Sequence, residues 1–554
     1  MYKQYNTPEE RLVLNFDFDV PSNHIVRFIS LFVDSMPESE FILSTTTTGR
    51  PGHHPRMLLK VLLFAYSRSV FSGRQIARMN AEMIPMKWLT NDEYICYRSI
   101  NSFRSNPRTS TLIQRTFIYF TLLLKDHHYL THDALFIDGT KVEADANKYS
   151  FVWKKSVEKY DAKLNQNIHA LYHELIEQQV QLAMKEDELQ TSKGLTQLIQ
   201  AIDTTLDEIE QAIELENTPV VGGSPNKRRR RLMKKYRRQL ETDYLPRKQK
   251  YETAKTLFNG RNSYSKTDTD ATFMCMKEDP MKNRELKPGY NLQIATHNQF
   301  VVSYGIFPNP TDMKTLRPFL NSIETLDLFG TIVADSGYGS EDNYQFVIEE
   351  LEKEALIPYT MYRKEQTRKY RHDETKRHNW QYNEELDCYT DHQGVQFSFN
   401  RYMTQTDKQG ITRDFKLYKA DKTQATTELD ALALTPSGRQ RSIQVNPVWE
   451  SFKQQVKDNL ASDSGSYLYG QRKVDVEPVF GFMKRNFGVR RVHVRGAMGV
   501  SNDLGLLLMS MNLAKLAGKV LRKGVGFVLF CVFLDRKNKN SEVMSFLNHF
   551  AVVF

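Results

Sequence analysis

The stretch ALFIDGTKVE, residues 134–143, decides the fold of this chain. Four apolar residues run directly into Asp138, a pattern typical of a buried strand. The stretch GTIVAD, residues 330–335, repeats the arrangement, and Asp335 is followed by Ser336-Gly337. We therefore expect each acid to end a hydrophobic strand and to precede a glycine turn.

Two interpretations of these acids stay open at this point. Burying an isolated carboxylate costs several kcal/mol unless something compensates the charge. An acid at a strand end beside glycine therefore often faces a site, where a metal ion can pair with it. The alternative is a turn-forming Asp, because Asp-Gly and Asp-Ser-Gly are common turn sequences. For Asp138 or Asp335 taken alone, the turn is the more frequent explanation.

A third acid stands in YGQRKVDVEPVFGFMKR, residues 469–485. Pro478 fits best near the start of a helix, which predicts that Glu477 lies at or near a helix N-terminus. There Glu477 stays ionised and able to bind metal. Lys484 follows Glu477 by seven residues, two helical turns, so both are expected on one face. The alternative is a surface salt bridge worth under ~1 kcal/mol.

The first 110 residues read as helical. Helices are expected over residues 54–71, 74–79 and 99–103, separated by tight turns. Such short helices with exposed arginines suit a helix-turn-helix-like DNA reader, and a plain helical bundle is the alternative. The arginines concerned are Arg50, Arg56, Arg68, Arg74 and Arg78.

A long polar region, about residues 153–259, predicts paired helices that bend at Val220–Pro225. The chain carries a net charge of +10, and it is concentrated here: twelve basic and two acidic residues lie between Lys227 and Lys250. A polyanion is the natural partner of such a cluster, whereas a solvated basic helix is the alternative. The second helix opens with Lys227 and the four arginines that follow it, Arg228, Arg229, Arg230 and Arg231.

Further along, strands and helices alternate. Strands are expected at 271–276, 290–295, 300–307, 330–335 and 355–358, and helices at 311–328, 340–352, 474–487 and 502–516. Residues 361–450 look polar and irregular, and the tail after Lys523 matches no pattern.

Composition excludes several classes. With 554 residues and 64.7 kDa, we expect three to five structural units. The longest apolar run, Val525–Leu534, is about half of a membrane span. The N-terminal stretch shows no secretory signal. Four widely spaced cysteines argue against a disulfide scaffold or a zinc ribbon and fit a reducing cytoplasm.

Taken together, the three acids change the interpretation. The order of elements is that of a ribonuclease-H-like nucleotidyl transferase core: a strand with Asp138, a hairpin, a helix, a strand with Asp335 and a helix with Glu477. There carboxylates bridge two Mg²⁺ ions ~3.5–4 Å apart. We therefore expect an α/β protein with a ribonuclease-H-like mixed-sheet catalytic core, an all-helical N-terminal domain and a long helical insertion.

The same motifs resemble a known family. IDGTK (137–141), ADSGY (334–338) and VEPVFG (476–481) look like the three acid motifs of bacterial insertion-sequence transposases of the DDE type. Among these transposases, the motifs look most like those of the branch with a Tyr–Arg–Glu–Lys signature, the insertion-sequence-1182-like group. Residues 49–71, 266–271 and 281–295 also look similar, so the resemblance covers residues 15–515.

The resemblance implies that Asp138, Asp335 and Glu477 are catalytic and bind Mg²⁺, for which Mn²⁺ can substitute. Lys484 would contact the DNA end. Tyr469 and Arg472 match the Tyr-x-x-Arg part but lie one residue too far from Glu477, so either Arg472 or Lys473 fills the arginine role. No zinc site is expected, because the cysteine cluster of relatives is missing.

The implied activity is cleavage of insertion-sequence ends and their joining to target DNA. A catalytically silent DNA-binding relic and a nuclease without end specificity are the alternatives. Expected partners are double-stranded DNA and further copies of the chain, a homodimer or higher oligomer, with no membrane, in a bacterial cytoplasm. Backbone phosphate is expected on Arg490, Arg491 and Arg495, for which a solvated cationic face is the alternative, and DNA is also expected on Arg228, Arg229, Arg230 and Arg231.

The expected domain boundaries follow from these assignments. They are a helical DNA-binding domain (1–125), the catalytic core (130–146, 265–360 and 455–520), a helical hairpin insertion with a basic arm (147–262), a polar insertion (361–454) and a divergent tail (521–554).

Overall fold

A computed structural model describes residues 20–21, 23–41, 52–181, 185–216, 224–276, 284–407, 410–423 and 426–522. The tail after Lys523, residues 220–223 of the expected bend and Arg50 lie outside these residues.

A mixed sheet forms the centre of the molecule. Its strands are β1 (Ala134–Glu143), β4 (Thr272–Cys275), β5 (Leu286–His297), β6 (Phe300–Phe307), β7 (Thr331–Val333) and β8 (Glu354–Leu356). The order is β4-β5-β1-β7-β8, and β6 also pairs with β5. β5 runs antiparallel to β1, β4 and β6, whereas β7 is parallel to β1 and β8 is parallel to β7. Because β1 and β7 are parallel, their carboxyl ends point towards the same edge of the sheet.

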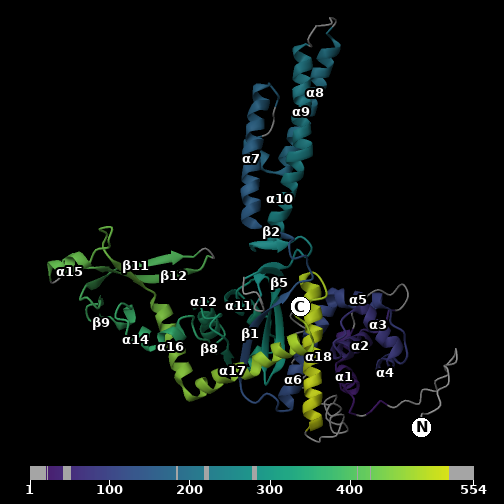
Figure 1. Cartoon of the computed structure of the whole chain (residues 1–554), viewed down its shortest axis with the longest axis vertical. Helices are drawn as coiled ribbons and strands as arrows, with labels where there is room; N and C mark the ends of the chain where they lie inside the picture. The colour runs from purple at the N-terminus through teal and green to yellow at the C-terminus, as the bar shows by residue number, and fades with distance from the viewer. Residues whose placement is uncertain are drawn as a thin grey trace, which may run out of the picture.

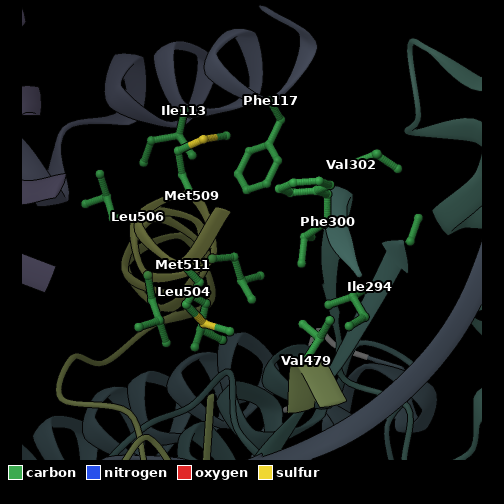
Figure 2. Packing of buried hydrophobic residues seen from close by; sticks show 14 of the residues in the cluster. Ile113, Phe117, Ile294, Phe300, Val302, Val479, Leu504, Leu506, Met509 and Met511 are labelled. Carbon is green, nitrogen blue, oxygen red and sulfur yellow. The ribbon is translucent and has the colours of Figure 1, made fainter. Parts of the chain in front are cut away.

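Helices from both ends of the chain cover this sheet. The N-terminal helices are α1 (Ile25–Asp34), α2 (Pro55–Ser67), α3 (Gly73–Glu82), α4 (Ile84–Thr90), α5 (Tyr97–Ser105) and α6 (Pro107–Asp126). The C-terminal helix α18 (Ala497–Arg522) packs between them and β6. Figure 2 shows Met509 and Leu506 of α18 close to Ile113 and Phe117 of α6, and Phe300 of β6 beyond them. One continuous hydrophobic core thus joins the N-terminal helices to the sheet.

A buried polar contact reinforces this junction. The hydroxyl of Tyr66 on α2 donates to Asp503 on α18, and Arg104 of α5 reaches both groups, at 2.8 and 3.2 Å. Because the three side chains are almost fully buried, each needs the other two as partners.

The helical insertion is an arm that projects from the sheet (Figure 1). It contains α7 (Lys154–Glu177), α8 (Ser192–Glu214), α9 (Pro225–Gln239) and α10 (Leu245–Phe258), with a π turn at Leu240–Tyr244 between the last two. Its hydrophobic core is separate from the main one. The short ladder of β2 (Phe151–Trp153) and β3 (Ser263–Ser265) closes its base. The expectation of two paired helices is incomplete: in the described residues α7, α8 and the continuous α9–α10 rod pack together.

The segment expected to be polar and irregular is instead a small antiparallel sheet. Its strands are β9 (Gln381–Asn383), β10 (Cys388–Thr390), β11 (Gln396–Thr406), β12 (Thr412–Ala420) and β13 (Ser442–Val445), in the order β13-β12-β11-β10-β9. Only a small set of side chains, among them Val395, Phe397 and Tyr418, forms its core. The expectation was wrong because polar residues dominate these strands and dilute the alternation that marks a strand.

Two expected helices are shorter than their patterns suggested. Within residues 311–328 the α-helix covers only α11 (Leu316–Asn321), between short 3₁₀ turns. Within residues 340–352, α12 (Glu341–Tyr344) passes into a π turn over Gln345–Glu350. The remaining helices are α13 (Tyr362–Glu365), α14 (Arg368–Arg371), α15 (Thr427–Leu432), α16 (Pro447–Ala461) and α17 (Asp463–Gly481).

Candidate active site

Asp138 and Asp335 lie side by side at one edge of the sheet. β1 and β7 are parallel, their last paired residues are Phe136 and Val333, and each acid follows its member of that pair by two residues. Asp138 is 8% exposed, and Asp335 is half-buried. Asp335 follows the carboxyl end of β7, where sites usually lie in a parallel sheet, and Asp138 lies within the neighbouring strand β1.

Only one of the two acids ends its strand. β7 stops at Val333, and Asp335 starts a turn in which its Oδ1 accepts a 2.8 Å hydrogen bond from Gly337 N. β1, by contrast, continues past Asp138 to Glu143, paired with β5. The expected glycine turn after Asp138 is therefore wrong. Gly139 lies within the strand, and a Cβ there would meet Gln293 Nε2 at 2.2 Å.

A basic side chain from α17 reaches Asp138. Arg472 Nη1 lies 3.5 Å from Asp138 Oδ2, and Gly139 N donates to Oδ1 at 2.8 Å. The side chains of Arg472 and Asp138 are only 10% and 11% exposed. Of the two candidates for the signature arginine, Arg472 is thus at the acid pair, whereas Lys473 is exposed. Tyr469, one turn earlier, packs against the main core.

Glu477 does not lie at a helix N-terminus, contrary to the expectation. α17 begins at Asp463, and Pro478 lies inside it. A proline lacks the N–H that would bond the carbonyl four residues back. Here that carbonyl, of Val474, accepts instead from Gln299 Nε2 at 2.9 Å. An outside donor therefore compensates the proline, and the helix continues.

The last signature residue approaches the same strand as Arg472. Lys484 lies in a π turn, Phe482–Asn486, that extends α17, and its Nζ donates to Thr140 Oγ1 at 2.8 Å. Thr140 is two residues beyond Asp138 and so shares its face of the strand. Glu477 lies between Arg472 and Lys484 along the helix. Its side chain is exposed and has no hydrogen bond or ion pair within the described chain.

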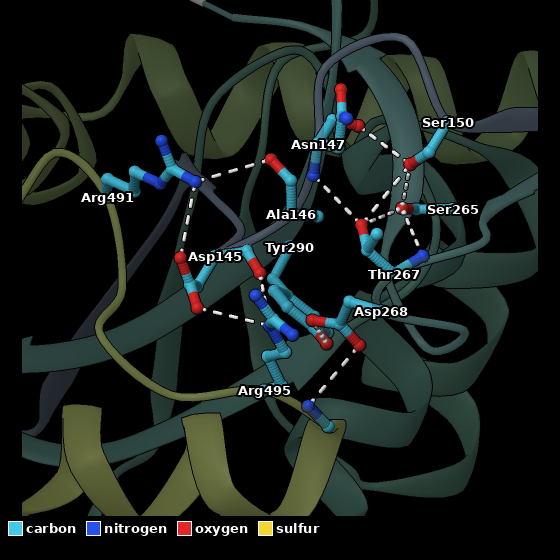
Figure 3. A network of polar contacts seen from close by, with 11 residues as sticks. Asp145, Ala146, Asn147, Ser150, Ser265, Thr267, Asp268, Tyr290, Arg491 and Arg495 are labelled. Atoms are coloured by element: carbon cyan, nitrogen blue, oxygen red, sulfur yellow. Dashed lines mark hydrogen bonds and ion pairs between the residues drawn. The ribbon is translucent and has the colours of Figure 1, made fainter.

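The segment after α17 is tied to the far end of β1 (Figure 3). Arg491 Nη2 lies 3.2 Å from Asp145 Oδ1, and Arg495 Nε lies 3.1 Å from Oδ2 of the same acid. Glu143 N donates to the carbonyl of Arg490 at 3.0 Å, and the Arg490 side chain is exposed. Arg491 and Arg495, both expected phosphate ligands, are therefore already paired with an acid.

The arginines of the arm fall into two groups, one that contacts other parts of the arm and one that is exposed. Arg229 Nη2 donates to the carbonyl of Gln178 at 2.6 Å, and Arg230 lies 3.9 Å from Glu210. Arg228 and Arg231 are exposed and form no ion pair in the described chain. Helical spacing places these two, with Lys235 and Arg238, along one outer face of α9.

Sequence reasoning missed a polar network beneath the acid pair. Tyr338 is fully buried, and its hydroxyl donates to Gln293 Oε1. Gln293 Nε2 in turn donates to Asp312 Oδ1 at 2.9 Å. Burial, followed by the charges of Asp312, Asp138 and Asp335, raises the pKa of Tyr338 well above its usual value. The signal in the sequence was the pair of polar residues, Asn291 and Gln293, which alternate with Leu292 and Ile294 in the strand.

The donor set at this edge fits a hard divalent cation. Carboxylate oxygens are the ligands that Mg²⁺ prefers, and few are needed because the ion keeps several waters. Across the described ranges, no three His, Cys, Asp or Glu side chains are gathered in a group that could hold a metal ion. The structure thus brings Asp138 and Asp335 together and leaves Glu477 on the helix opposite.

Comparison with protein families identifies two regions. Residues 261–513 match the family model of the transposase DDE domain, and residues 14–106 match that of a transposase domain, DUF772. No curated protein and no solved structure matched the chain. None of the helices in the described ranges is long and apolar enough to cross a membrane.

These two domains indicate a DNA transposase of the DDE type. Asp335 and Glu477 lie within the matched DDE region, and Asp138 lies before it. Its strand β1 is nonetheless the central partner of β5 and β7, both inside that region. The tertiary structure therefore completes a domain that the arm divides in the sequence.

Proposed function

We propose that the protein cleaves the ends of an insertion sequence and joins them to target DNA, as an enzyme of the insertion-sequence-1182-like group. The observation that carries the proposal is that Asp138 and Asp335 each follow, by two residues, the last paired residues of the neighbouring parallel strands β1 and β7, in a sheet whose region matches a transposase DDE domain. The Tyr–Arg–Glu–Lys motif on α17, directed at the same strand through Arg472 and Lys484, supports it.

The strand order supports a ribonuclease-H-like core. In space the strands follow β6-β5-β1-β7-β8, antiparallel on one side of β1 and parallel on the other. That arrangement places the first acid on the central strand and the second on its parallel neighbour. The arm enters between the first and second strands of this core and leaves the order intact.

Asp138, Asp335 and Glu477 would hold Mg²⁺, or Mn²⁺ in its place. When bound, the metal ions activate the attacking oxygen and stabilise the leaving oxygen of a phosphodiester. In the chain itself, the guanidinium of Arg472 and the backbone N–H of Gly139 face the carboxylate of Asp138. Thr140 holds the ammonium of Lys484 above the same face of β1, where it can pair with a phosphate of the DNA end.

We further propose that double-stranded DNA runs from the acid pair along the basic side chains. Tyr469, Arg472 and Lys484 would face the element end, and Arg490, Arg491 and Arg495 the adjoining backbone. On the arm, Arg228 and Arg231 are the exposed members of the basic run. Two element ends are processed together, so a homodimer or higher oligomer is the proposed active form.

The test is strand cleavage of a duplex containing the boundary of the DNA element that encodes the chain, with and without Mg²⁺. A scrambled duplex controls for sequence, and Asp335→Asn removes one carboxylate charge with little change of shape. Asp327→Asn, at an exposed acid in the connection before β7, is the matched control.

Mg²⁺-dependent nicking at the boundary, lost only in Asp335→Asn, is the expected result. Equal cutting of the scrambled duplex would show a nuclease without end specificity. Salt-sensitive binding without nicking under either metal would show a DNA-binding relic. Nicking by Asp335→Asn at the parental rate would refute the site.

A further inference from the structure

The turn that joins β5 to β6 holds α17 just before Glu477. This turn consists of Asn298 and Gln299. Gln299 N donates to Asp475 Oδ1 at 3.0 Å, and Gln299 Nε2 donates to the carbonyl of Val474 at 2.9 Å. One residue of the sheet thus contacts α17 two and three positions before Glu477.

A lysine of α18 fixes the orientation of the Gln299 amide. Lys515 Nζ donates at 2.9 Å both to Gln299 Oε1 and to the carbonyl of Asn298. Because an ammonium group only donates, Oε1 must be the atom that faces Lys515, and Nε2 is left for α17. Asp475 is only 6% exposed, so its carboxylate also needs the donor that the Gln299 backbone supplies.

The helix needs an outside donor at this point because of Pro478. Proline lacks an N–H, and its ring crowds the carbonyl four residues back, which is that of Val474. Helices bend most readily at such positions. α17 and its π turn contact β1 on both sides of the proline, through Arg472 before it and Lys484 after it. Glu477 immediately precedes the proline, so its direction depends on how the helix passes this point.

The backbone of the turn indicates that a glutamine is kept here for its side chain. Asn298 and Gln299 have φ of 51° and 62°. Positive φ at both central residues is the mark of a type I′ turn, for which Asn-Gly is the favoured sequence. Asn298 suits the first position, whereas Gln299 stands at the second, where glycine would avoid the strain. Strained residues persist where the surrounding contacts hold them, and they cluster at functional sites.

We propose that Gln299 is a positioning residue for Glu477: its amide supplies the donor that Pro478 lacks and so fixes the direction of the helix where the third acid projects. This inference rests on the proposed function, in which Glu477 would hold a divalent cation. It gives β5 a second task, because the strand that pairs with β1 at Asp138 also carries the turn that holds α17.

Three substitutions test the role of the amide. Gln299→Gly removes it and gives the turn the residue that its backbone favours. Pro478→Ala restores an N–H that can bond the carbonyl of Val474 within the helix, so the Gln299 donor becomes redundant in that background. Asn298→Gly is the matched control, because its Nδ2 donates to the carbonyl of Tyr129 at 2.7 Å and not to α17.

Two measurements are made on the full chain. The first is the nicking rate on the duplex with the element boundary, at saturating DNA and Mg²⁺. The second is hydrogen exchange of the backbone amides of residues 474–484, without metal or DNA. Thermal unfolding of each variant confirms folding.

We expect Gln299→Gly to slow nicking by about tenfold or more, since misplacing a reacting group by about 1 Å can cost about a hundredfold. It should also speed exchange in residues 474–484. Both effects should largely disappear in the Pro478→Ala background, because the two changes act on one carbonyl and are not additive. Asn298→Gly should keep the parental values.

Parental nicking or parental exchange in Gln299→Gly would overturn the inference and leave the proposed function intact. An equal loss in Asn298→Gly, or an undiminished loss in the Pro478→Ala background, would do the same. A parent that does not nick the boundary would overturn the proposed function, and with it the role of Gln299.

Discussion

Arg472 lies 3.5 Å from Asp138 although 334 residues separate them in the chain. The arm and the small antiparallel sheet both enter the chain between these residues, yet α17 returns to β1. The pair has two consequences. It compensates a buried carboxylate without any bound ion, and it places a guanidinium where DNA phosphate is expected.

Replacing Arg472 with Ala should destabilise the protein by about 3 kcal/mol, because removing one partner of a buried pair leaves the other charge uncompensated. A divalent cation can replace the missing charge, so Mg²⁺ should recover part of the loss. Urea unfolding with and without Mg²⁺ measures both effects. The control is Lys473→Ala, at an exposed neighbour. Equal stability of the two variants would contradict the role of the pair.

Gly139→Ala should disrupt the site from within β1. The added Cβ would lie 2.2 Å from Gln293 Nε2 and 2.7 Å from Asp312 Oδ1, so these hydrogen-bonded side chains must move. We expect a loss of about 1–3 kcal/mol, the usual cost of overpacking. Gly470→Ala is the matched control, because no atom lies within 4 Å of its Cβ position on α17. That change should stabilise the helix by about 0.5–1 kcal/mol. If both variants shift the unfolding midpoint in the same direction, that result would argue against the close contact.

The arm should bind DNA through its unpaired arginines. In the double variant Arg228→Gln/Arg231→Gln, we expect the slope of log affinity against log salt for duplex DNA to fall by about 2, since each lost phosphate contact removes about 0.9. Arg230→Gln/Lys234→Gln removes the same charge from side chains that already face Glu210 at 3.9 and 2.9 Å. Its slope should change less. Equal slopes in the two variants would show that only net charge matters.

His297 should make stability depend on pH. Thr131 N donates to Nε2 at 3.0 Å, and Nδ1 lies 3.0 Å from the carbonyl of Ala134, so the folded protein holds the neutral ring. Burial, with smaller effects of His132 and Lys519, lowers the pKa of His297 from 6.5 to about 4. Between these values the unfolded chain binds the extra proton and the folded chain does not. Stability is therefore complete above pH 6.5 and declines as the pH falls towards 4.

The size of this effect is about 3 kcal/mol, from about 1.4 kcal/mol for each unit of pKa difference. Urea unfolding across pH 4–7 measures it. His297→Gln should flatten the profile in this window, and His392→Gln, at an exposed histidine, should not. An unchanged slope in His297→Gln would assign the pH dependence to other groups.

Local patterns were enough to find much of this molecule. The apolar run before Asp138 predicted β1, and the helical periodicity of residues 54–71 and 502–516 predicted α2 and most of α18. These segments are deeply buried, so their apolar side chains follow the period of the element. Where few side chains are buried, as in β9–β13, the period was diluted and the sheet was missed.

The sequence by itself determined the residue types of the site: two acids after apolar runs, and a later motif with Arg472, Glu477 and Lys484. Tertiary structure decided how they meet. Register between β1 and β7 sets Asp138 beside Asp335, and a donor from Gln299 lets α17 continue through Pro478. Asn291 and Gln293 of β5 both donate to Asp312, which the chain brings close to Gly139 and Gly337. Such contacts depend on strand pairing across long chain separations, which no local pattern encodes.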